Sequence, residues 1–271
     1  MSKERLDKIL TDKGYFETKN KAQAAIMAGD VKINGAVVTK AGYMLEPKED
    51  DVFEIKTMPY VSRGGFKLEK ALKEFNINLK GRICLDAGAS TGGFTDCMLQ
   101  NGALKVYSAD TGYGQLAWKL RIDERVKTIE KVNLKNCAES DIYSETDKRA
   151  SFIAADLSFI SITKVLANLI KLADKPDFEI AALIKPQFEA ARGQTGKGGI
   201  VKDKKVHIEV INKVISCAET LNLRAAGLTY SPIKGAKGNI EYLVHLVNEK
   251  NIEAVSLNEI EKIVFQAAGS F

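Results

Sequence analysis

From residue 62 onward, short apolar segments alternate with helical stretches, and this alternation restricts the fold more than any other feature. The expected strands are 83–85, 106–109, 126–129, 152–155, 180–184, 225–229 and 242–246. Helical patterns stand between most of them, notably at 161–172 and 204–221, and a further helix is expected at 67–75. Such alternation predicts an α/β domain, Rossmann-like, with a doubly wound, mostly parallel, seven-stranded sheet.

A glycine-rich turn, Asp86 to Phe94, follows the first expected strand. Glycines at a strand-to-helix turn let a ligand approach the backbone at the positive end of the next helix. Ser90 stands where the dinucleotide fingerprint GxGxxG requires its second glycine, which disfavours a pyrophosphate-binding dehydrogenase. An acidic residue just before the glycines suits a ligand with a cationic amino-acid group better than a diphosphate.

Two more polar positions extend this site. Asp110 ends the next strand, where an acidic side chain accepts hydrogen bonds from ribose hydroxyls, and Asn133 follows the third strand, placed to face an adenine. Together they indicate an adenosyl ligand with an amino-acid tail, S-adenosylmethionine (SAM). The alternative is a glycine turn with incidental acids. The expected cofactor-binding residues are Asp86, Gly88, Ser90, Gly92, Gly93, Phe94, Asp110, Asn133 and Asp156.

Four ionisable residues occupy positions that such a sheet would bring together, Lys67, Asp156, Lys185 and Glu241. Asp156 and Lys185 each follow an apolar strand, and ligands of open α/β sheets bind outside the carboxyl ends of the strands. A lysine held among carboxylates can orient a ribose hydroxyl and accept or relay its proton during methylation. These four are the candidate catalytic residues; the alternative is that they are ordinary solvated charges near loops.

Other chemistries fit less well. The sequence after Asp156 lacks the Pro-Pro-aromatic turn typical of exocyclic amine methylation, and no cysteine ends a strand as a carbon-5 nucleophile would. The four cysteines have no CxxC or metal-ligand spacing, and the chain has two histidines, so we expect no metal site. We also expect a cytoplasmic protein without membrane association, since no apolar run suggests a signal peptide or a membrane span.

Residues 189–199 form a glycine-rich segment beside the expected site. Between residues 185 and 205 there are six Lys or Arg against two acidic residues. Mobility with positive charge suits a lid that closes over an RNA backbone. A solvated surface loop is the equal alternative.

The first 57 residues have the pattern of a small separate domain. Apolar stripes with helical spacing lie within 6–10 and 22–26, and Gly29 follows the second as a C-cap. An Asn-Gly pair at 34–35 predicts a hairpin, and 52–55 a further strand. Residues 1–40 hold eight Lys or Arg against five acidic residues, a modest basic patch. We expect domains at 1–57 and 62–271, joined by a linker at 58–61.

The ordered set of motifs resembles a known family. Residues 5–7, 18–22 and 29–35 resemble the RNA-binding fold of ribosomal protein S4. In combination with the segments after residue 61, the chain is similar over essentially its whole length to the TlyA family. The segments that carry this second similarity are 62–67, 86–94, 110–116, 156–160, 185–189 and 238–241.

This resemblance implies an FtsJ-like 2′-O-methyltransferase that acts on 16S or 23S ribosomal RNA or both, with cytidine the usual target and SAM the cofactor. The expected partner is ribosomal RNA, either protein-free or in ribosomal subunits. It implies the catalytic tetrad already given. The expected RNA-binding residues are Arg5, Lys8, Thr18, Lys19, Lys21, Lys32 and Arg63. The first module departs from the family by having Thr18-Lys19 in place of Ser-Arg, which keeps the charge but loses a bidentate phosphate contact. Tyr60 stands near the tryptophan found in the linker of some members.

Three alternatives remain open on the sequence. The chain could be an RNA-binding or ribosome-assembly factor with a vestigial SAM domain, although all four candidate catalytic side chains are present. The family's historical label as a haemolysin suggests a lytic protein, but no amphipathic or spanning segment supports it. A small-molecule methyltransferase would leave the N-terminal module without a role.

Overall fold

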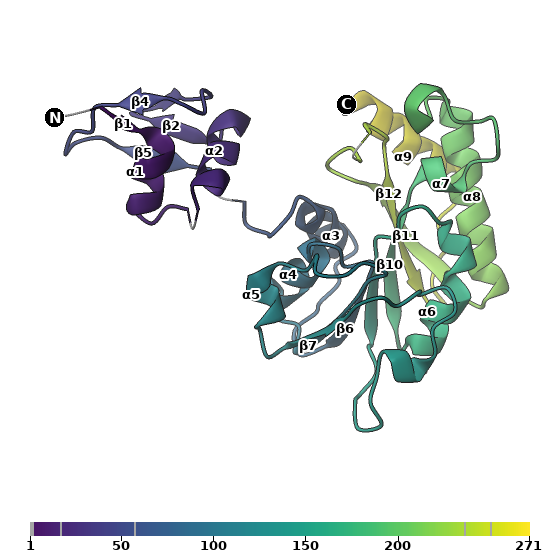
Figure 1. Ribbon diagram of the computed structural model, residues 1–271. Helices are drawn as coiled ribbons and strands as arrows, with labels where there is room; N and C mark the ends of the chain where they lie inside the picture. Colours follow the sequence, from purple (N-terminus) through teal and green to yellow (C-terminus); the bar gives the residue numbers. More distant parts are fainter. Residues whose placement is uncertain (1–2, 17, 57, 236, 250) are drawn as a thin grey trace. The chain divides into compact units, whose positions relative to one another are not determined.

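The computed structural model describes residues 3–16, 18–56, 58–235, 237–249 and 251–271. The chain divides into two compact units, Met1–Pro59 and Tyr60–Phe271 (Figure 1). Residues 1, 2, 17 and 57, which belong to the first expected domain, lie outside the described residues. Tyr60 and Val61, which we expected in the linker, belong to the larger unit: the Tyr60 ring is buried and the Val61 amide donates to Asp96 Oδ2 (2.8 Å).

The smaller unit combines two helices with two small sheets. Helices α1 (Leu6–Asp12) and α2 (Lys19–Ala28) stand beside a three-stranded sheet in the order β3-β2-β5 and a two-stranded sheet of β1 (Glu4–Arg5) and β4 (Met44–Leu45). The strands of this three-stranded sheet are β2 (Val31–Ile33), β3 (Ala36–Val37) and β5 (Phe53–Ile55). One apolar core joins the helices to this sheet through Leu6, Leu10, Ile26 and Val31.

Local signals fix the ends of α2. The Thr18 hydroxyl accepts a hydrogen bond from the Lys21 amide (3.3 Å) and so caps the first turn. Gly29 ends the helix with a φ of 76°, a left-handed conformation that glycine adopts without steric cost. The C-cap predicted at Gly29 is therefore confirmed.

The larger unit contains the predicted seven-stranded sheet, in the order β11-β12-β10-β9-β6-β7-β8. β12 pairs antiparallel with both β10 and β11, and the other described pairings in this sheet are parallel. The fold class is thus confirmed as a doubly wound, mostly parallel sheet. The strands are β6 (Ile83–Ala87), β7 (Lys105–Ala109), β8 (Val126–Ile129), β9 (Phe152–Ala155), β10 (Glu179–Ile184), β11 (Arg224–Tyr230) and β12 (Tyr242–Val247).

Helices cover both faces of this sheet (Figure 1). Leu68, Met98 and Leu120 belong to the apolar core on one face, and Leu169, Val214 and Val264 to the core on the other. The first face carries α3 (Gly64–Glu74), α4 (Gly93–Gln100) and α5 (Trp118–Arg121). The second carries α6 (Leu166–Leu172), α8 (Lys204–Thr220) and α9 (Leu257–Gly269), and the short α7 (Pro186–Glu189) follows β10.

The helix expected at 161–172 is interrupted. A 3₁₀ turn (Ile162–Lys164) precedes α6. The cause is the buried carboxylate of Glu189, which accepts hydrogen bonds from Ser161 Oγ (2.5 Å) and the Ile162 amide (2.6 Å). Because these contacts hold the first turn against α7, the regular helix begins only at Leu166.

The sheet register gathers three strand ends at one edge. Ala155, the last residue of β9, pairs with Ala87 at the end of β6 and with Ala182 near the end of β10. Since β12 is antiparallel, its first residue, Tyr242, pairs with Ile184 at the end of β10. The residues just beyond these strand ends therefore meet at the carboxyl edge of the sheet.

Gly65 sets the position of α3, because a Cβ there would overlap the ring of Tyr60. We predict that Gly65→Ala lowers the free energy of unfolding by about 1–3 kcal/mol through overpacking. Adding Tyr60→Ala should relieve much of that cost, so the double variant loses less than the sum of the single changes. Urea unfolding of the three variants measures this coupling, and strict additivity would contradict the packing account.

Candidate active site

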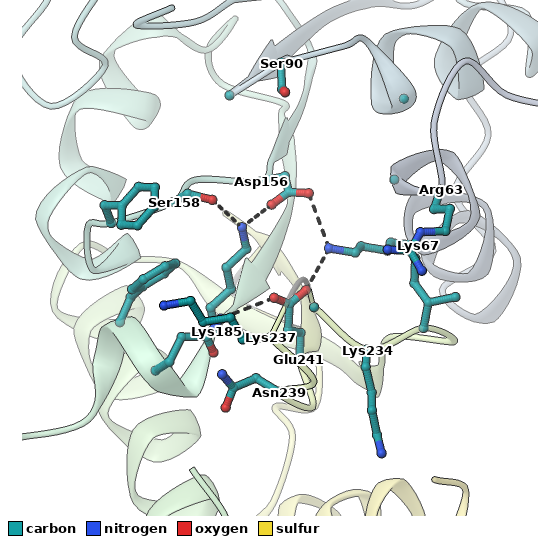
Figure 2. Close-up of a pocket in the computed structure, with 18 of the residues that line it drawn as sticks. Arg63, Lys67, Ser90, Asp156, Ser158, Lys185, Lys234, Lys237, Asn239 and Glu241 are labelled. Carbon is teal, nitrogen blue, oxygen red and sulfur yellow. Dashed lines mark hydrogen bonds and ion pairs between the residues drawn. The ribbon is translucent and has the colours of Figure 1, made fainter. Parts of the chain in front are cut away.

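The four candidate catalytic side chains meet at the carboxyl edge of the sheet. Lys67 lies in the first turns of α3, Asp156 follows β9, Lys185 follows β10, and Glu241 precedes β12. Figure 2 shows them pointing toward one another from these four elements. The fold thus brings together residues that are far apart in sequence; Lys67 and Glu241 are separated by 174 positions.

An ion-pair chain connects the four groups. Lys67 Nζ lies 2.7 Å from Glu241 Oε2 and 3.6 Å from Asp156 Oδ2. Lys185 Nζ lies 2.5 Å from Asp156 Oδ1 (Figure 2). Asp156 therefore bridges the two lysines, one on each carboxylate oxygen, and the order is Glu241–Lys67–Asp156–Lys185.

Burial makes this chain of charges mutually dependent. Lys67, Lys185 and Glu241 are all buried, and Asp156 is partly open to the cavity. Burial alone would lower the pKa of Lys67, but the adjacent carboxylates of Asp156 and Glu241 outweigh it, and its pKa is raised. Lys67 therefore remains a cation. Two lysines against two carboxylates leave the set with no net charge.

Three residues that the sequence did not single out support the four. Ser158 Oγ accepts a hydrogen bond from Lys185 Nζ (2.9 Å), and Gln187 Nε2 approaches Glu241 Oε1 (3.4 Å). Gly235 lies so close to Glu241 that an added Cβ would stand 3.0 Å from its carboxyl carbon. Each is recognisable only by proximity in space, since serine, glutamine and glycine are common in loops.

Two adjoining cavities open at this edge. The first has a volume of about 610 Å³ and is walled by the four ionic residues with Arg63 and Phe94, among others. The second, about 340 Å³, is lined by residues that follow β7, β8 and β9, including Asp110 and Asn133. The two cavities share Gly88, Ser90, Asp156, Ser158 and Phe159 as lining residues. Asp156 thus stands where they meet.

Gly88 permits this junction. Its φ is 94°, and a Cβ there would lie 2.6 Å from the backbone oxygen of Asp156. Ser90 also has a positive φ (48°), held by a hydrogen bond from its amide to Asp110 Oδ2 (2.8 Å). Asp110 Oδ1 accepts from the Gly112 amide (2.6 Å). The Asp110 carboxylate therefore shapes the loop and also lines the second cavity.

Not every expected cofactor residue reaches a cavity. Gly93 and Phe94 line the first one, but Asp86 and Gly92 line neither. Asp86 is fully buried, and its Oδ2 accepts hydrogen bonds from Thr95 through the amide (2.8 Å) and the hydroxyl (2.6 Å). Burial raises the pKa of Asp86 to about 7, against the lowering effect of the Thr95 hydrogen bonds. Its position fixes the start of α4.

The mouth of the cavities carries two aromatic rings. Phe159 lines both cavities, is 91% exposed and has a φ of 63°, a conformation that a bulky side chain rarely adopts. Its ring centroid lies 5.3 Å from that of Phe188. A strained, exposed aromatic residue at a cavity mouth indicates a function other than core packing.

The glycine-rich segment expected as a lid forms one wall of the first cavity. Thr195, Gly198 and Gly199 line it. Buried Asn239 ties the end of the segment to the β11–β12 loop: its Nδ2 donates to the Gly199 oxygen (3.0 Å), and its Oδ1 accepts from the Val201 amide (2.9 Å). The segment is therefore anchored at this end by an asparagine from the motif 238–241, for which the sequence predicts no such contact.

The expected RNA-binding residues of the smaller unit are exposed, and several have acidic partners. Arg5 donates to buried Asp7 through Nε (3.0 Å) and Nη2 (2.7 Å), and this guanidinium holds the pKa of Asp7 near 2. Lys8 lies 3.2 Å from Glu4, and Lys32 lies 3.6 Å from Glu54. Thr18 caps α2, as described above. The remaining members of the set are Lys19 and Lys21 on α2, and Arg63, which lines the first cavity of the larger unit.

The described residues also bear on two other features, metal-binding clusters and membrane-spanning helices. No group of three or more His, Cys, Asp or Glu side chains in this part of the chain could hold a metal ion. Within the same residues, no helix is both long and apolar enough to cross a membrane.

Comparisons with known proteins agree with this architecture. The FtsJ-like methyltransferase family model matches residues 60–248, and the S4 domain model matches residues 4–52. The chain is 39% identical to the 16S/23S rRNA (cytidine-2′-O)-methyltransferase TlyA of Mycobacterium tuberculosis, over 97% of this chain and 96% of that protein. It is 46% identical to Hemolysin A of Brachyspira hyodysenteriae, over 90% and 99% respectively.

A solved structure extends the likeness to the whole chain. A Streptococcus thermophilus protein described as a hemolysin is 41% identical, with a TM-score of 0.77, and the match covers 100% of this chain and 98% of that one. The chain therefore belongs to the TlyA family and is an FtsJ-like methyltransferase with an S4 domain at its N-terminus.

The buried ion pairs predict a pH-dependent stability. Because the pKa of Lys67 is raised above its ordinary 10.5, its contribution is fully present below that value and is lost as pH rises through the folded pKa. Lys67→Met should cost about 3–5 kcal/mol near pH 8, because Glu241 stays buried without its cation. Urea unfolding measures this cost, which should shrink as the pH rises through the raised pKa of Lys67, because the wild-type protein then loses the same cation.

The matched control is Lys67→Met with Glu241→Gln, which removes both charges of the closest pair. It should be more stable than Lys67→Met alone. Equal losses in the single and double variants would show that the two groups are not coupled.

Proposed function

We propose that this protein transfers a methyl group from SAM to the 2′-hydroxyl of a ribose, that of a cytidine, in ribosomal RNA. The observation that carries the proposal is the buried Glu241–Lys67–Asp156–Lys185 chain at the junction of two cavities. The cytidine and the ribosomal substrate come from the M. tuberculosis relative, whose name states both.

The second cavity fits the cofactor. Gly88 lets its backbone approach that of Asp156, where a Cβ would collide with the Asp156 oxygen, and both residues line this cavity. Asp110 offers carboxylate oxygens to ribose hydroxyls, and exposed Asn133 offers an amide to an adenine edge. When bound there, SAM supplies an activated methyl group on its sulfonium.

The first cavity suits the ribose of the target nucleotide. A ribose hydroxyl is a poor acid, so its oxygen must be oriented and its proton removed as it attacks. Lys185 Nζ, held between Asp156 Oδ1 and Ser158 Oγ, is placed to donate a hydrogen bond to that oxygen. The Lys185–Asp156 pair then accepts or relays the proton.

Lys67 and Glu241 position this pair. Lys67 contacts the second oxygen of Asp156, and Glu241 in turn fixes Lys67 from the opposite side. Since the cofactor is already activated, accurate positioning supplies much of the rate enhancement. The neutral sum of the four charges also permits burial without a large desolvation penalty for an unpaired ion.

RNA enters the proposal through two features. The S4 domain presents Arg5, Lys19 and Lys21 at its surface, as suits contact with phosphates. Phe159 and Phe188 at the cavity mouth offer aromatic faces, on which a base splayed out of the RNA can stack. A small-molecule substrate would need neither feature.

We predict that Lys185→Ala abolishes methyl transfer, by at least a hundredfold, and leaves the affinity for SAM within a few-fold of the wild type. Lys171→Ala, on the exposed surface of α6, is the matched control and should keep full activity. Methyl transfer and equilibrium SAM binding are measured separately. A collapse of SAM affinity in Lys185→Ala would identify Lys185 as a cofactor-binding residue instead.

The proposal itself is tested by transfer of labelled methyl from SAM to purified 30S subunits, 50S subunits and protein-free rRNA. Label on a ribose 2′-oxygen is the expected result, and the preferred particle identifies the substrate. Label on a base would contradict the reaction type. If no RNA were labelled by a protein that binds SAM, the role of an assembly factor would replace catalysis.

A further inference from the structure

We propose that Lys234 and Lys237, on the loop between β11 and β12, bind the phosphates of the RNA strand next to the target nucleotide. The inference rests on the proposed function, because it assumes that an RNA nucleotide occupies the first cavity. It adds a second RNA-binding surface, on the methyltransferase unit, to the one expected on the S4 domain.

The wall of the first cavity carries a surplus of positive charge. The charged lining residues are Arg63, Lys67, Asp156, Lys185, Lys234, Lys237 and Glu241, which is five cations and two anions and gives a net charge of +3. The four catalytic residues neutralise one another. The whole surplus therefore lies on Arg63, Lys234 and Lys237, and among the described residues no other carboxylate lines this cavity.

Two of these cations, Arg63 and Lys237, lack acidic partners within the described residues. Arg63 and Lys237 are exposed, and no salt bridge involves either of them in this part of the chain. Lys234 Nζ contacts the main-chain oxygen of Phe271, the last residue of the printed sequence (3.3 Å), so its charge already has a partner. By contrast, Lys105 and Lys127 on the sheet share the carboxylate of Asp147. The wall thus keeps positive charge available for an anion.

The β11–β12 loop is fixed to the active site. The Gly235 amide donates to the Asn239 oxygen (2.9 Å), and the Gly238 amide donates to the Gly235 oxygen (2.8 Å), so Lys237 lies at the tip of a tight turn. The same turn leads directly to Glu241, against which Gly235 packs closely. Phosphates held by this loop would be held in register with the ionic centre. Figure 2 shows Lys234 directed away from that centre, as suits a contact beyond the target ribose.

The chemistry favours phosphate over a base. Lysine is a compact, flexible point charge that binds phosphate without reading a base edge. A ribose in the cavity brings its own 5′ and 3′ phosphates, which carry one negative charge each. The loop therefore contributes affinity and placement of the strand, and sequence selection lies elsewhere.

The test is the salt dependence of RNA binding. A labelled single-stranded RNA oligonucleotide is titrated with the full-length protein at several KCl concentrations, and log K is plotted against log[KCl]. The slope is negative, and each lost phosphate contact reduces its magnitude by about 0.7. Lys234→Gln with Lys237→Gln should lower it by roughly 1.4, and the KM for RNA should rise roughly tenfold near 0.15 M salt.

Two sets of variants serve as controls. Lys171→Gln with Lys262→Gln removes two exposed cations from α6 and α9 and should leave the slope unchanged. Lys234→Arg with Lys237→Arg keeps both charges and should keep the slope. SAM affinity and thermal unfolding show whether each protein is folded, and Lys237→Gln alone, at the exposed tip, should give half the effect.

The inference is overturned if the double glutamine variant binds RNA with the wild-type slope, or if the α6/α9 control loses as much. Failure of the proposed function would be seen in the methyl-transfer assay and not in the salt dependence of RNA binding. A wild-type protein that transfers no methyl to RNA, yet binds RNA with a slope that these two lysines control, would retain the inference and lose the reaction.

Discussion

The position of Asp156 between two buried lysines is the constraint on which the rest of the larger unit depends. Neither lysine is tolerable in the protein interior without an anion, so α3, β9, β10 and β12 must deliver their side chains to one place. That requirement explains the antiparallel β12, which brings Glu241 to the carboxyl edge. It also explains Gly88 and Gly235, where a side chain would displace Asp156 or Glu241.

The centre of the site has no net charge, and the rim, formed by Arg63, Lys234 and Lys237, is positively charged. The four ionic residues cancel in charge, so they can be buried and can handle a proton without attracting phosphate into the reaction centre. Among the described residues, no carboxylate other than Asp156 and Glu241 lines this cavity, so in the proposed complex the cations of the rim remain available to the RNA backbone. Arg5 in the smaller unit follows a third pattern, because buried Asp7 holds its guanidinium in place while one face stays exposed.

The sequence predicts the sheet and the four ionic residues because their signals are local. Apolar runs such as 180–184 end at Lys185, and strand ends converge at one edge in every open α/β sheet. Ser158, Gln187 and Asn239 lie in segments that carry the family resemblance, but their roles could not be predicted, since each depends on a contact formed only in the folded chain. That Asp86 faces the cofactor stays a prediction: the start of α4 takes its Oδ2 as a buried hydrogen-bond acceptor, while its buried Oδ1 has no partner among the described residues.

The central claim is that the ionic centre activates a ribose hydroxyl. Its most direct test uses two RNA substrates that differ in one atom: ribose or 2′-deoxyribose at the nucleotide that the wild-type protein methylates. The account predicts methyl transfer from SAM to the ribose substrate and none above background to the deoxyribose substrate, with similar binding of both. Equal transfer to the two would place the methyl group on the base and contradict the assignment.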